Sequence, residues 1–313
     1  MGPERRHFLS LGKRGLLLMK RLAALALVCL MPFAGLAQET VEADFEAGRW
    51  FYEDTERGVR VEIVRQEDEE NRVLWYEADL RFGEESPLRF LTANEETPGK
   101  GFWYPERLAR EKRAVFAIND DQFGHRVYNH DTVGVIVRGG EALSERTRKS
   151  GSKGWPPLDT AAFFPDGSMR VFESAEHTGE EYVQMGAETV LAFGPWLVRG
   201  GEINPALETS YRTKEPRTAI GMIEPYHYVA LFVEGRVERS GGVACEWLAQ
   251  RMAELGAAEA INLDGGKTSC LVFMGVKLSI SNPDGLVRDG RSVSGMIGLG
   301  ESDLAPAWEG LDK

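Results

Sequence analysis

Apolar and polar residues alternate in the first part of the chain in a way that predicts β-strands. Val59–Ile63 alternates apolar with charged side chains, which is typical of a strand with one buried face. Leu74–Leu80 predicts a second strand, and the charged residues 66–71 predict the connection between the two. Residues 38–48 are mostly polar, and we predict a flexible segment there.

Apolar runs without alternation predict strands that are buried on both faces. The clearest is Ala114–Ile118, which ends at Asn119, Asp120 and Asp121. Asp166-Gly167 predicts the turn of a hairpin. Further strands are predicted at 133–137, 161–164, 218–223, 228–233, 258–263, 271–274 and 276–280.

Two segments have helical spacing instead. Tyr104–Lys112 predicts a short helix, and Cys245–Leu255 predicts a longer one that Gly256 ends. Because strands outnumber helices, we predict an α+β fold. It would consist of a single domain over 49–302, with a mixed, strand-rich central sheet and a few flanking helices, followed by a C-terminal tail at 303–313.

The most informative polar residues lie at the end of the predicted strand 258–263. Side chains alternate along a strand, so Asn262 and Asp264 share one side of the chain. The glycines at 265–266 permit a sharp turn beside an incoming ligand. An amine and two hydroxyls follow, on Lys267, Thr268 and Ser269. Asp-Gly between two strands is also the signal of a plain hairpin, so this segment alone leaves both interpretations open.

Four segments resemble, in the same order, the motifs of a known enzyme family. They are Ala117–Asn119, Phe193–Val198, Pro216–Gly221 and Asn262–Cys270. On these residues the chain is similar to the phosphodiester glycosidase family, which includes N-acetylglucosamine-1-phosphodiester α-N-acetylglucosaminidase. Each motif is weak alone, but four in order are more specific. The resemblance implies hydrolysis of sugar-1-phosphodiester bonds in envelope polysaccharides or other glycans.

The resemblance also implies roles for individual residues. Asp264 is the first candidate catalytic carboxylate, and Arg217 is the candidate phosphate ligand, because a guanidinium pairs bidentately with phosphate. Asn262 would hydrogen-bond a sugar hydroxyl or orient Asp264. The N–H groups of Gly265 and Gly266 are predicted to form an anion nest. The other candidate substrate-binding residues are Asn119, Lys267, Thr268 and Ser269.

The second catalytic carboxylate is predicted at Asp120 or Asp121. Glycoside cleavage usually needs two carboxyl groups, and adjacent carboxylates raise one another's pKa, as an acid requires. The same pair is also suited to capping a turn. We expect one pocket to be lined by Asn119, Asp121, Arg217, Asn262 and Asp264.

Two positions depart from the family pattern, which usually has glycine at both. They are Asp120 and Lys267. The lysine side chain would either reach the phosphate as a second cation or partly block the pocket. These departures keep open a third function, that of a non-catalytic exopolysaccharide-binding or assembly protein.

Asp120 and Asp121 also begin a cluster of candidate metal ligands, which continues with His125, His130 and Asp131. The spacing matches no recognised metal motif, so we predict no cofactor and leave the metal unassigned. A metal-dependent phosphodiesterase that uses this cluster is the alternative function.

The N-terminal region predicts export. Met19-Lys20-Arg21 precedes the apolar run 22–36, and small residues up to Ala37 follow the pattern of a cleavage site. We predict a signal peptide over 1–37, with Met19 as an alternative start. An uncleaved anchor is the other interpretation. Export would place the protein in the periplasm or outside the cell, with no stable membrane span after cleavage.

Charge and cysteine content restrict the partners. The formal net charge is −12 over 313 residues, and nucleic-acid binding needs a basic face, so we predict no nucleic-acid partner. The expected partner is a carbohydrate or a sugar phosphate, and the oligomeric state is not predicted. Cys245 and Cys270 remain after the predicted cleavage, and both a disulfide and two buried free thiols fit.

Overall fold

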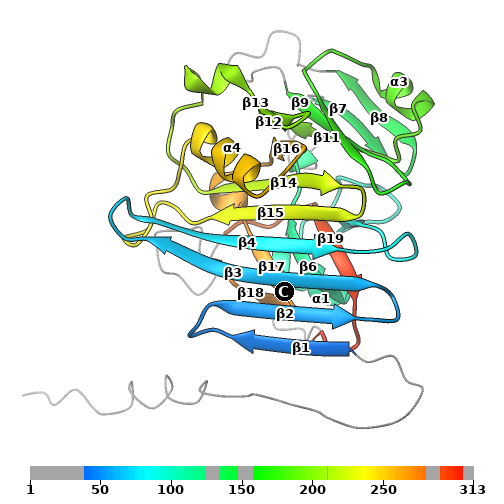
Figure 1. The fold of residues 1–313 in the computed structure, drawn as a ribbon. Helices are drawn as coiled ribbons and strands as arrows, with labels where there is room; N and C mark the ends of the chain where they lie inside the picture. Colours follow the sequence, from blue (N-terminus) through cyan, green and yellow to red (C-terminus); the bar gives the residue numbers. More distant parts are fainter. Residues whose placement is uncertain (1–38, 124–133, 147–157, 210, 280–289, 306–313) are drawn as a thin grey trace, which may run out of the picture. The chain divides into compact units, whose positions relative to one another are not determined.

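The computed structural model describes residues 39–123, 134–146, 158–209, 211–279 and 290–305. These ranges fall in one compact unit. They contain three antiparallel β-sheets and three short α-helices (Figure 1). No helix in these ranges is long and apolar enough to cross a membrane.

The large sheet has nine strands. Their order is β1-β2-β3-β4-β15-β14-β16-β12-β13, and Figure 1 shows them stacked upward from β1. The strands are β1 (Glu39–Asp44), β2 (Arg49–Asp54), β3 (Val59–Asp68), β4 (Val73–Arg81), β12 (Trp196–Arg199), β13 (Glu202–Ile203), β14 (Arg217–Glu224), β15 (His227–Val233) and β16 (Glu259–Asn262).

The other two sheets have five strands each. The second sheet, in the order β10-β9-β11-β7-β8, comprises β7 (Gly134–Arg138), β8 (Glu141–Arg146), β9 (Asp159–Phe163), β10 (Met169–Phe172) and β11 (Thr189–Phe193). The third, in the order β18-β17-β6-β19-β5, comprises β5 (Arg89–Thr92), β6 (Ala114–Asn119), β17 (Leu271–Phe273), β18 (Val276–Lys277) and β19 (Gly295–Glu301).

The single mixed sheet that we predicted is therefore wrong. Every pair of neighbouring strands in the described ranges is antiparallel, and the strands form three sheets. The apolar run at β6 suggested a central strand, and all six of its residues are indeed buried. Its two faces pack on different layers, however: Phe116 and Ile118 pack in the main core, whereas Ala117, on the opposite face, packs in a smaller cluster with Leu108. Burial on both faces does not require a parallel sheet.

The helices cover sheet faces. They are α1 (Pro105–Glu111), α3 (Gly179–Gln184) and α4 (Cys245–Glu254), with short 3-10 helices η1 (Pro205–Glu208) and η2 (Gly266–Thr268). Leu248 and Met252 of α4 pack against Leu231 and Ala260 of the large sheet. Gly256 has φ +87°, as a helix-ending glycine requires, so the prediction of this helix and its end is confirmed.

The segment 38–48, predicted as flexible, contains a strand. Glu39–Asp44 pairs along its whole length with β2 at the edge of the large sheet. An edge strand has one neighbour and tolerates charged side chains, so its sequence carries little apolar signal. Beyond Val64, β3 pairs only with β4, and it runs on through the charged residues to Asp68, two residues beyond the predicted start of the connection at Gln66.

Candidate functional site

Four strand ends meet at the side chain of Asn119, the last residue of β6. Its Nδ2 donates to the carbonyls of Asp120 and Asp264 at 3.1 and 2.9 Å. Its Oδ1 accepts from Thr218 Oγ1 at 2.8 Å and from the N–H of Cys270 at 3.0 Å. An amide has two donors and two acceptor lone pairs, so these bonds use them all. Asn119, predicted as a substrate ligand, uses its side chain in this geometry to join strand ends. We call its bonds to Asp120, Thr218, Asp264 and Cys270 the Asn119 clamp.

Asp264 lies just beyond β16 in a tight turn and is half-buried. Its Oδ1 accepts the N–H of Gly265 at 2.9 Å, and its own N–H donates to the carbonyl of Asp120 at 3.4 Å. The N–H of Gly266 donates to the carbonyl of Pro216 at 3.0 Å. Both glycine amides therefore have partners within the chain, and the predicted anion nest is not formed.

Arg217, the first residue of β14, lies on the same side as this turn. A Cβ built on Gly265 would be 3.9 Å from its Nη1. Its Nη2 donates to the carbonyl of Thr213 at 2.9 Å and its Nε to that of Val243 at 3.3 Å. These two bonds fix the plane of the guanidinium next to the turn.

A second arginine, Arg236, lies against the same turn and was missed by the sequence analysis. A Cβ on Gly266 would be 3.2 Å from both of its terminal nitrogens, so the absence of a side chain lets the guanidinium approach. Its Nε donates to Glu215 at 2.7 Å. Lys267, which is exposed, directly follows Gly266 in the sequence. We call Arg217, Arg236 and Lys267 with the turn Asp264–Gly266 the cationic turn.

Three buried oxygens beside the cationic turn have no hydrogen-bond partner among the described residues. They are Asn262 Oδ1, Thr268 Oγ1 and Ser269 Oγ, on side chains that are at most 1% exposed. The Nδ2 of Asn262 is engaged, because it donates to the carbonyl of Gly194 at 2.7 Å. Buried polar atoms are nearly always paired, so three unpaired ones in one short segment mark a place where water or a ligand supplies the partner.

Asp120 and Asp121 point to different places. Asp121 Oδ1 accepts from Arg138 Nη2 at 3.1 Å, and its Oδ2 accepts the N–H of Ala192 at 2.9 Å. This ion pair joins the end of β6 to the second sheet.

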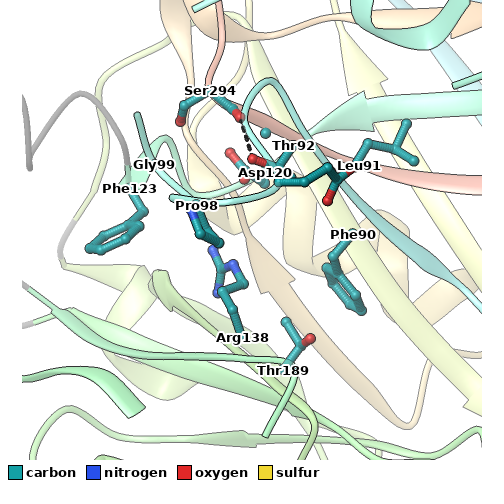
Figure 2. Close-up of a pocket in the computed structure, with 13 residues that line it drawn as sticks. Phe90, Leu91, Thr92, Pro98, Gly99, Asp120, Phe123, Arg138, Thr189 and Ser294 are labelled. Atoms are coloured by element: carbon teal, nitrogen blue, oxygen red, sulfur yellow. Dashed lines mark hydrogen bonds between the residues drawn. The ribbon is translucent and has the colours of Figure 1, made fainter. Parts of the chain in front are cut away.

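Asp120 instead lines a cavity of about 220 Å³. Its Oδ1 accepts the N–H of Gln122 at 2.8 Å, and its Oδ2 lies only 2.3 Å from where a Cβ on Gly295 would be. Figure 2 shows this cavity, with Asp120 and Arg138 among its labelled residues. The lining residues are Phe90, Leu91, Thr92, Glu95, Pro98, Gly99, Asp120, Phe123, Arg138, Gly139, Thr189, Ser294 and Gly295. We call it the Asp120 cavity.

The proposed metal cluster lies largely outside the described residues, which exclude His125, His130 and Asp131. In the part of the chain that is described, no three His, Cys, Asp or Glu side chains are arranged to hold a metal. Cys245 and Cys270 are both buried free thiols. Burial raises the pKa of the Cys270 thiol to about 12, so it is protonated at neutral pH.

A model of the phosphodiester glycosidase family matches residues 112–299. The chain belongs to the phosphodiester glycosidase family. The matched range includes Asn119, Arg217, Arg236 and the cationic turn, and it confirms the family predicted from the four motifs. Members of this family are hydrolases, and the matched range contains the whole second sheet and five of the nine strands of the large sheet.

The similar proteins differ in how much of this chain they match. An uncharacterised SPbeta prophage-derived protein, YomE, of Bacillus subtilis strain 168 is 30% identical over 165 residues, which are 52% of this chain and 24% of that protein. The chain thus spans about a quarter of that relative's length.

Two solved structures share the fold. The zebrafish N-acetylglucosamine-1-phosphodiester α-N-acetylglucosaminidase catalytic domain, auto-inhibited by its pro-peptide, has a TM-score of 0.59 at 17% identity, over 78% of this chain and 84% of that one. A hypothetical protein from Synechocystis has a TM-score of 0.50 at 15% identity, over 77% and 62%.

Proposed function

We propose that this protein hydrolyses sugar-1-phosphodiester bonds at the cationic turn. The observation that carries the proposal is that the guanidinium groups of Arg217 and Arg236 lie against the glycine turn that directly follows the half-buried Asp264, with Lys267 next in the sequence. Positive charge beside a carboxylate suits a substrate that is an anion at one end and a sugar at the other.

The cations would bind the phosphodiester. A guanidinium offers two parallel donors to phosphate oxygens, and charge-assisted bonds of this kind are about twice as strong as neutral ones. In the proposed reaction the bond between sugar C1 and the phosphate oxygen breaks. The phosphate leaves with the electron pair as a monoester, its charge stabilised by Arg217 and Arg236. Less acid assistance is needed for such a leaving group, so one carboxylate near the scissile bond suffices.

Asp264 would act on the sugar side of that bond. Its carboxylate stabilises positive charge at C1 and accepts a proton from the water that adds there. The unpaired Oδ1 of Asn262 would accept a hydrogen bond from a sugar hydroxyl. The unpaired hydroxyls of Thr268 and Ser269 would hold water at the base of the turn.

Oxygen-18 water tests the proposal. A panel of sugar-1-phosphodiesters, beginning with N-acetylglucosamine-1-phosphodiesters such as the zebrafish enzyme's name describes, is incubated with the protein and the products are weighed by mass spectrometry. Label in the sugar supports cleavage of the C1–O bond. Label in the phosphate would contradict it and identify a phosphodiesterase. Binding of the panel without turnover would point to a glycan-binding protein.

We also propose that the protein is exported and that its substrate is an envelope polysaccharide or another glycan. The motive is the charged start, apolar run and small-residue end between Met19 and Ala37. Mass spectrometry of the mature protein should find Gln38 at its N-terminus. A mature chain that keeps residues 22–36 in the membrane fraction would contradict this proposal.

A further inference from the structure

The guanidinium group of Arg236 is held beside the cationic turn by one carboxylate, that of Glu215. Arg236 Nε donates to Glu215 Oε2 at 2.7 Å, and Arg236 Nη2 lies 2.7 Å from the same oxygen. The third nitrogen, Nη1, has no hydrogen-bond partner among the described residues, and a Cβ on Gly266 would be 3.2 Å from it. One edge of the guanidinium therefore meets Glu215, and the N–H groups of Nη1 remain available beside the turn.

The backbone of Arg236 is held in a conformation that residues other than glycine seldom adopt. Its φ is +61°, in the left-handed region, and such conformations persist where the surrounding structure fixes them. The preceding Gly235 has no room for a side chain, because a Cβ there would lie 2.7 Å from the nitrogen of Pro216. The chain thus runs closely past Pro216 and turns at Arg236, whose side chain meets the carboxylate one residue before that proline.

The loop around Arg236 is closed by contacts that do not involve this carboxylate. The fully buried Glu234 accepts from Nε and Nη2 of Arg239 at 2.7 Å each. Val237 and Ser240 exchange two backbone bonds of 3.1 Å, and Ser240 Oγ donates to the carbonyl of Glu234 at 2.6 Å. The loop therefore fixes the backbone of Arg236, and the carboxylate fixes its side chain.

Glu215 is itself fixed by a backbone bridge to Val243. The N–H of Glu215 donates to the carbonyl of Val243 at 3.2 Å, and the N–H of Val243 donates back at 3.1 Å. A Cβ on Gly242 would lie 2.5 Å from the carbonyl of Glu215, so glycine permits this approach. The carbonyl of Val243 also accepts Arg217 Nε at 3.3 Å. One bridge thus positions the groups that hold both arginines of the cationic turn.

A carboxylate beside a phosphate site acts in two opposite ways. Its negative charge repels phosphate, but solvent and salt screen the interaction of exposed charges. Its bonds to Arg236 keep a side chain that is 40% exposed in one orientation, so less conformational freedom is lost when phosphate binds. Screening reduces the repulsion and not the orientation, so the net effect should favour binding.

We propose that Glu215 is a positioning residue, which orients Arg236 so that its guanidinium and that of Arg217 bind the same phosphate. This rests on the proposed function and extends it to a residue that acts through an arginine and not on the substrate. Loss of the carboxylate should therefore weaken phosphate binding, although it removes a negative charge from the neighbourhood of an anion.

The test compares Glu215→Ala with Glu215→Gln in the full chain. Glutamine keeps an acceptor oxygen for Arg236 Nε, whereas alanine removes it. We expect KM for the diester and Kd for inorganic phosphate, measured by calorimetry, to rise roughly tenfold in Glu215→Ala and less than about threefold in Glu215→Gln, with a smaller change in kcat. Tighter phosphate binding by Glu215→Ala, or equal effects of the two variants, would overturn the proposal, because both remove the charge and only alanine removes the acceptor.

A double-mutant cycle shows whether Glu215 acts through Arg236. In a protein that carries Arg236→Ala, the further change Glu215→Ala should not weaken phosphate binding again, since residues that act as one unit are not additive. A second tenfold loss would mean that Glu215 acts independently of Arg236 and would overturn the proposal.

NMR of the arginine Nε–H groups provides a measurement that does not need turnover. The signal that Arg236→Ala removes belongs to Arg236, and its protection from exchange with water should be lost in Glu215→Ala and kept in Glu215→Gln. An unchanged signal in Glu215→Ala would contradict the positioning role.

Glu176→Ala is the matched control. It breaks the pair of Glu176 with Arg199, in which the side chains are 32% and 39% exposed, close to the 28% and 40% of Glu215 and Arg236. It should leave KM and phosphate binding unchanged, and thermal melts of all variants check the fold. An equal loss of phosphate binding in Glu176→Ala would show a general effect of charge and refute the role of Glu215.

Turnover separates this proposal from the proposed function. If the wild type cleaves a diester and Glu215→Ala cleaves it with an unchanged KM, the positioning role fails while the proposed function stands. If the wild type cleaves no diester but Glu215→Ala weakens phosphate binding, the proposed function fails while Glu215 still positions Arg236 for an anion. A wild-type protein that neither cleaves a diester nor binds phosphate would overturn both.

Discussion

The cationic turn and the Asp120 cavity are neighbours built in opposite ways. The guanidinium groups of Arg217 and Arg236 lie against the glycines of the turn, whereas the guanidinium of Arg138, which lines the cavity, is paired with Asp121. The difference teaches that residues adjacent in sequence, Asp120 and Asp121, need not belong to one site: the first faces the cavity and the second ties two sheets together.

The largest effect should come from the carboxylate of the turn. Asp264→Asn keeps the shape of the side chain and its bond to Gly265, but it removes the charge. We expect turnover to fall by roughly 10²- to 10⁴-fold with an unchanged melting temperature. Kinetics on a diester beside thermal melts check this. Near-normal turnover would refute the mechanism, and a collapsed melting temperature would mean that Asp264 is a structural residue of a hairpin.

The ion pair between Asp121 and Arg138 should contribute to the stability of the fold rather than to turnover. Asp121→Ala leaves the guanidinium of Arg138, whose side chain is 14% exposed, without this carboxylate, and breaking a buried pair costs at most about 3–5 kcal/mol of unfolding free energy. Denaturant titration measures the loss. The matched control is Glu62→Ala, which breaks the exposed pair with Arg60 and should change stability by less than about 1 kcal/mol. Equal losses in both variants would remove the distinction between the buried pair and the surface pair.

Substitution of the two arginines of the cationic turn should weaken binding of the diester. Arg217→Lys and Arg236→Lys each replace a two-donor fork by a point charge, so we expect KM for the diester to rise roughly tenfold while kcat changes less. Steady-state kinetics on a diester check this prediction, and an unchanged KM in both variants would contradict phosphate binding by these two arginines.

The smallest effect concerns pH and a thiol at the boundary of the two regions. Burial raises the pKa of Cys270 from 9.0 to about 12, so the folded state holds this proton more tightly than the unfolded state does. The stability from this thiol is complete below about pH 9 and is lost as pH rises toward 12, with a slope of at most about 1.4 kcal/mol per pH unit.

Cys270→Ala removes this dependence and isolates it from the tyrosines that also titrate at high pH. Chemical denaturation at pH 8 and pH 10 should therefore show a smaller loss of stability in the variant than in the wild type. The same loss in both proteins would mean that the thiol is hydrated in solution.

Local patterns predicted most of the strands and the turn at the proposed site. The apolar runs at β6, β14, β15 and β16, the helix α4 and the hairpin at Asp166-Gly167 lie where the sequence predicted them. Each depends on a short stretch of side chains and its periodicity, which the sequence contains. The division of these strands into three antiparallel sheets depends on which strands pair, and periodicity does not contain that information.

The residues that meet at the site also depend on strand pairing, which periodicity does not contain. Arg236 follows β15 and reaches the turn because Val233 pairs with Arg217, so the ends of the two strands are neighbours. Arg138 reaches Asp121 from another sheet. Neither arginine lies in a motif, and their positions follow from strand pairing rather than from local sequence. Asn119 and Asp121 lie in the motif region, but their polar groups serve the connection of strands.

The Asn119 clamp also affects how fast the protein folds. Its side chain bonds to residues 99, 145 and 151 positions later in the chain. Closing loops of that length is slow compared with forming a hairpin, and contacts at large sequence separation lower folding rates. During synthesis, Asn119 at the end of β6 therefore cannot complete these hydrogen bonds until Cys270 has left the ribosome. Both the turn and the cavity adjoin that residue, so no N-terminal fragment ending before Cys270 can assemble either.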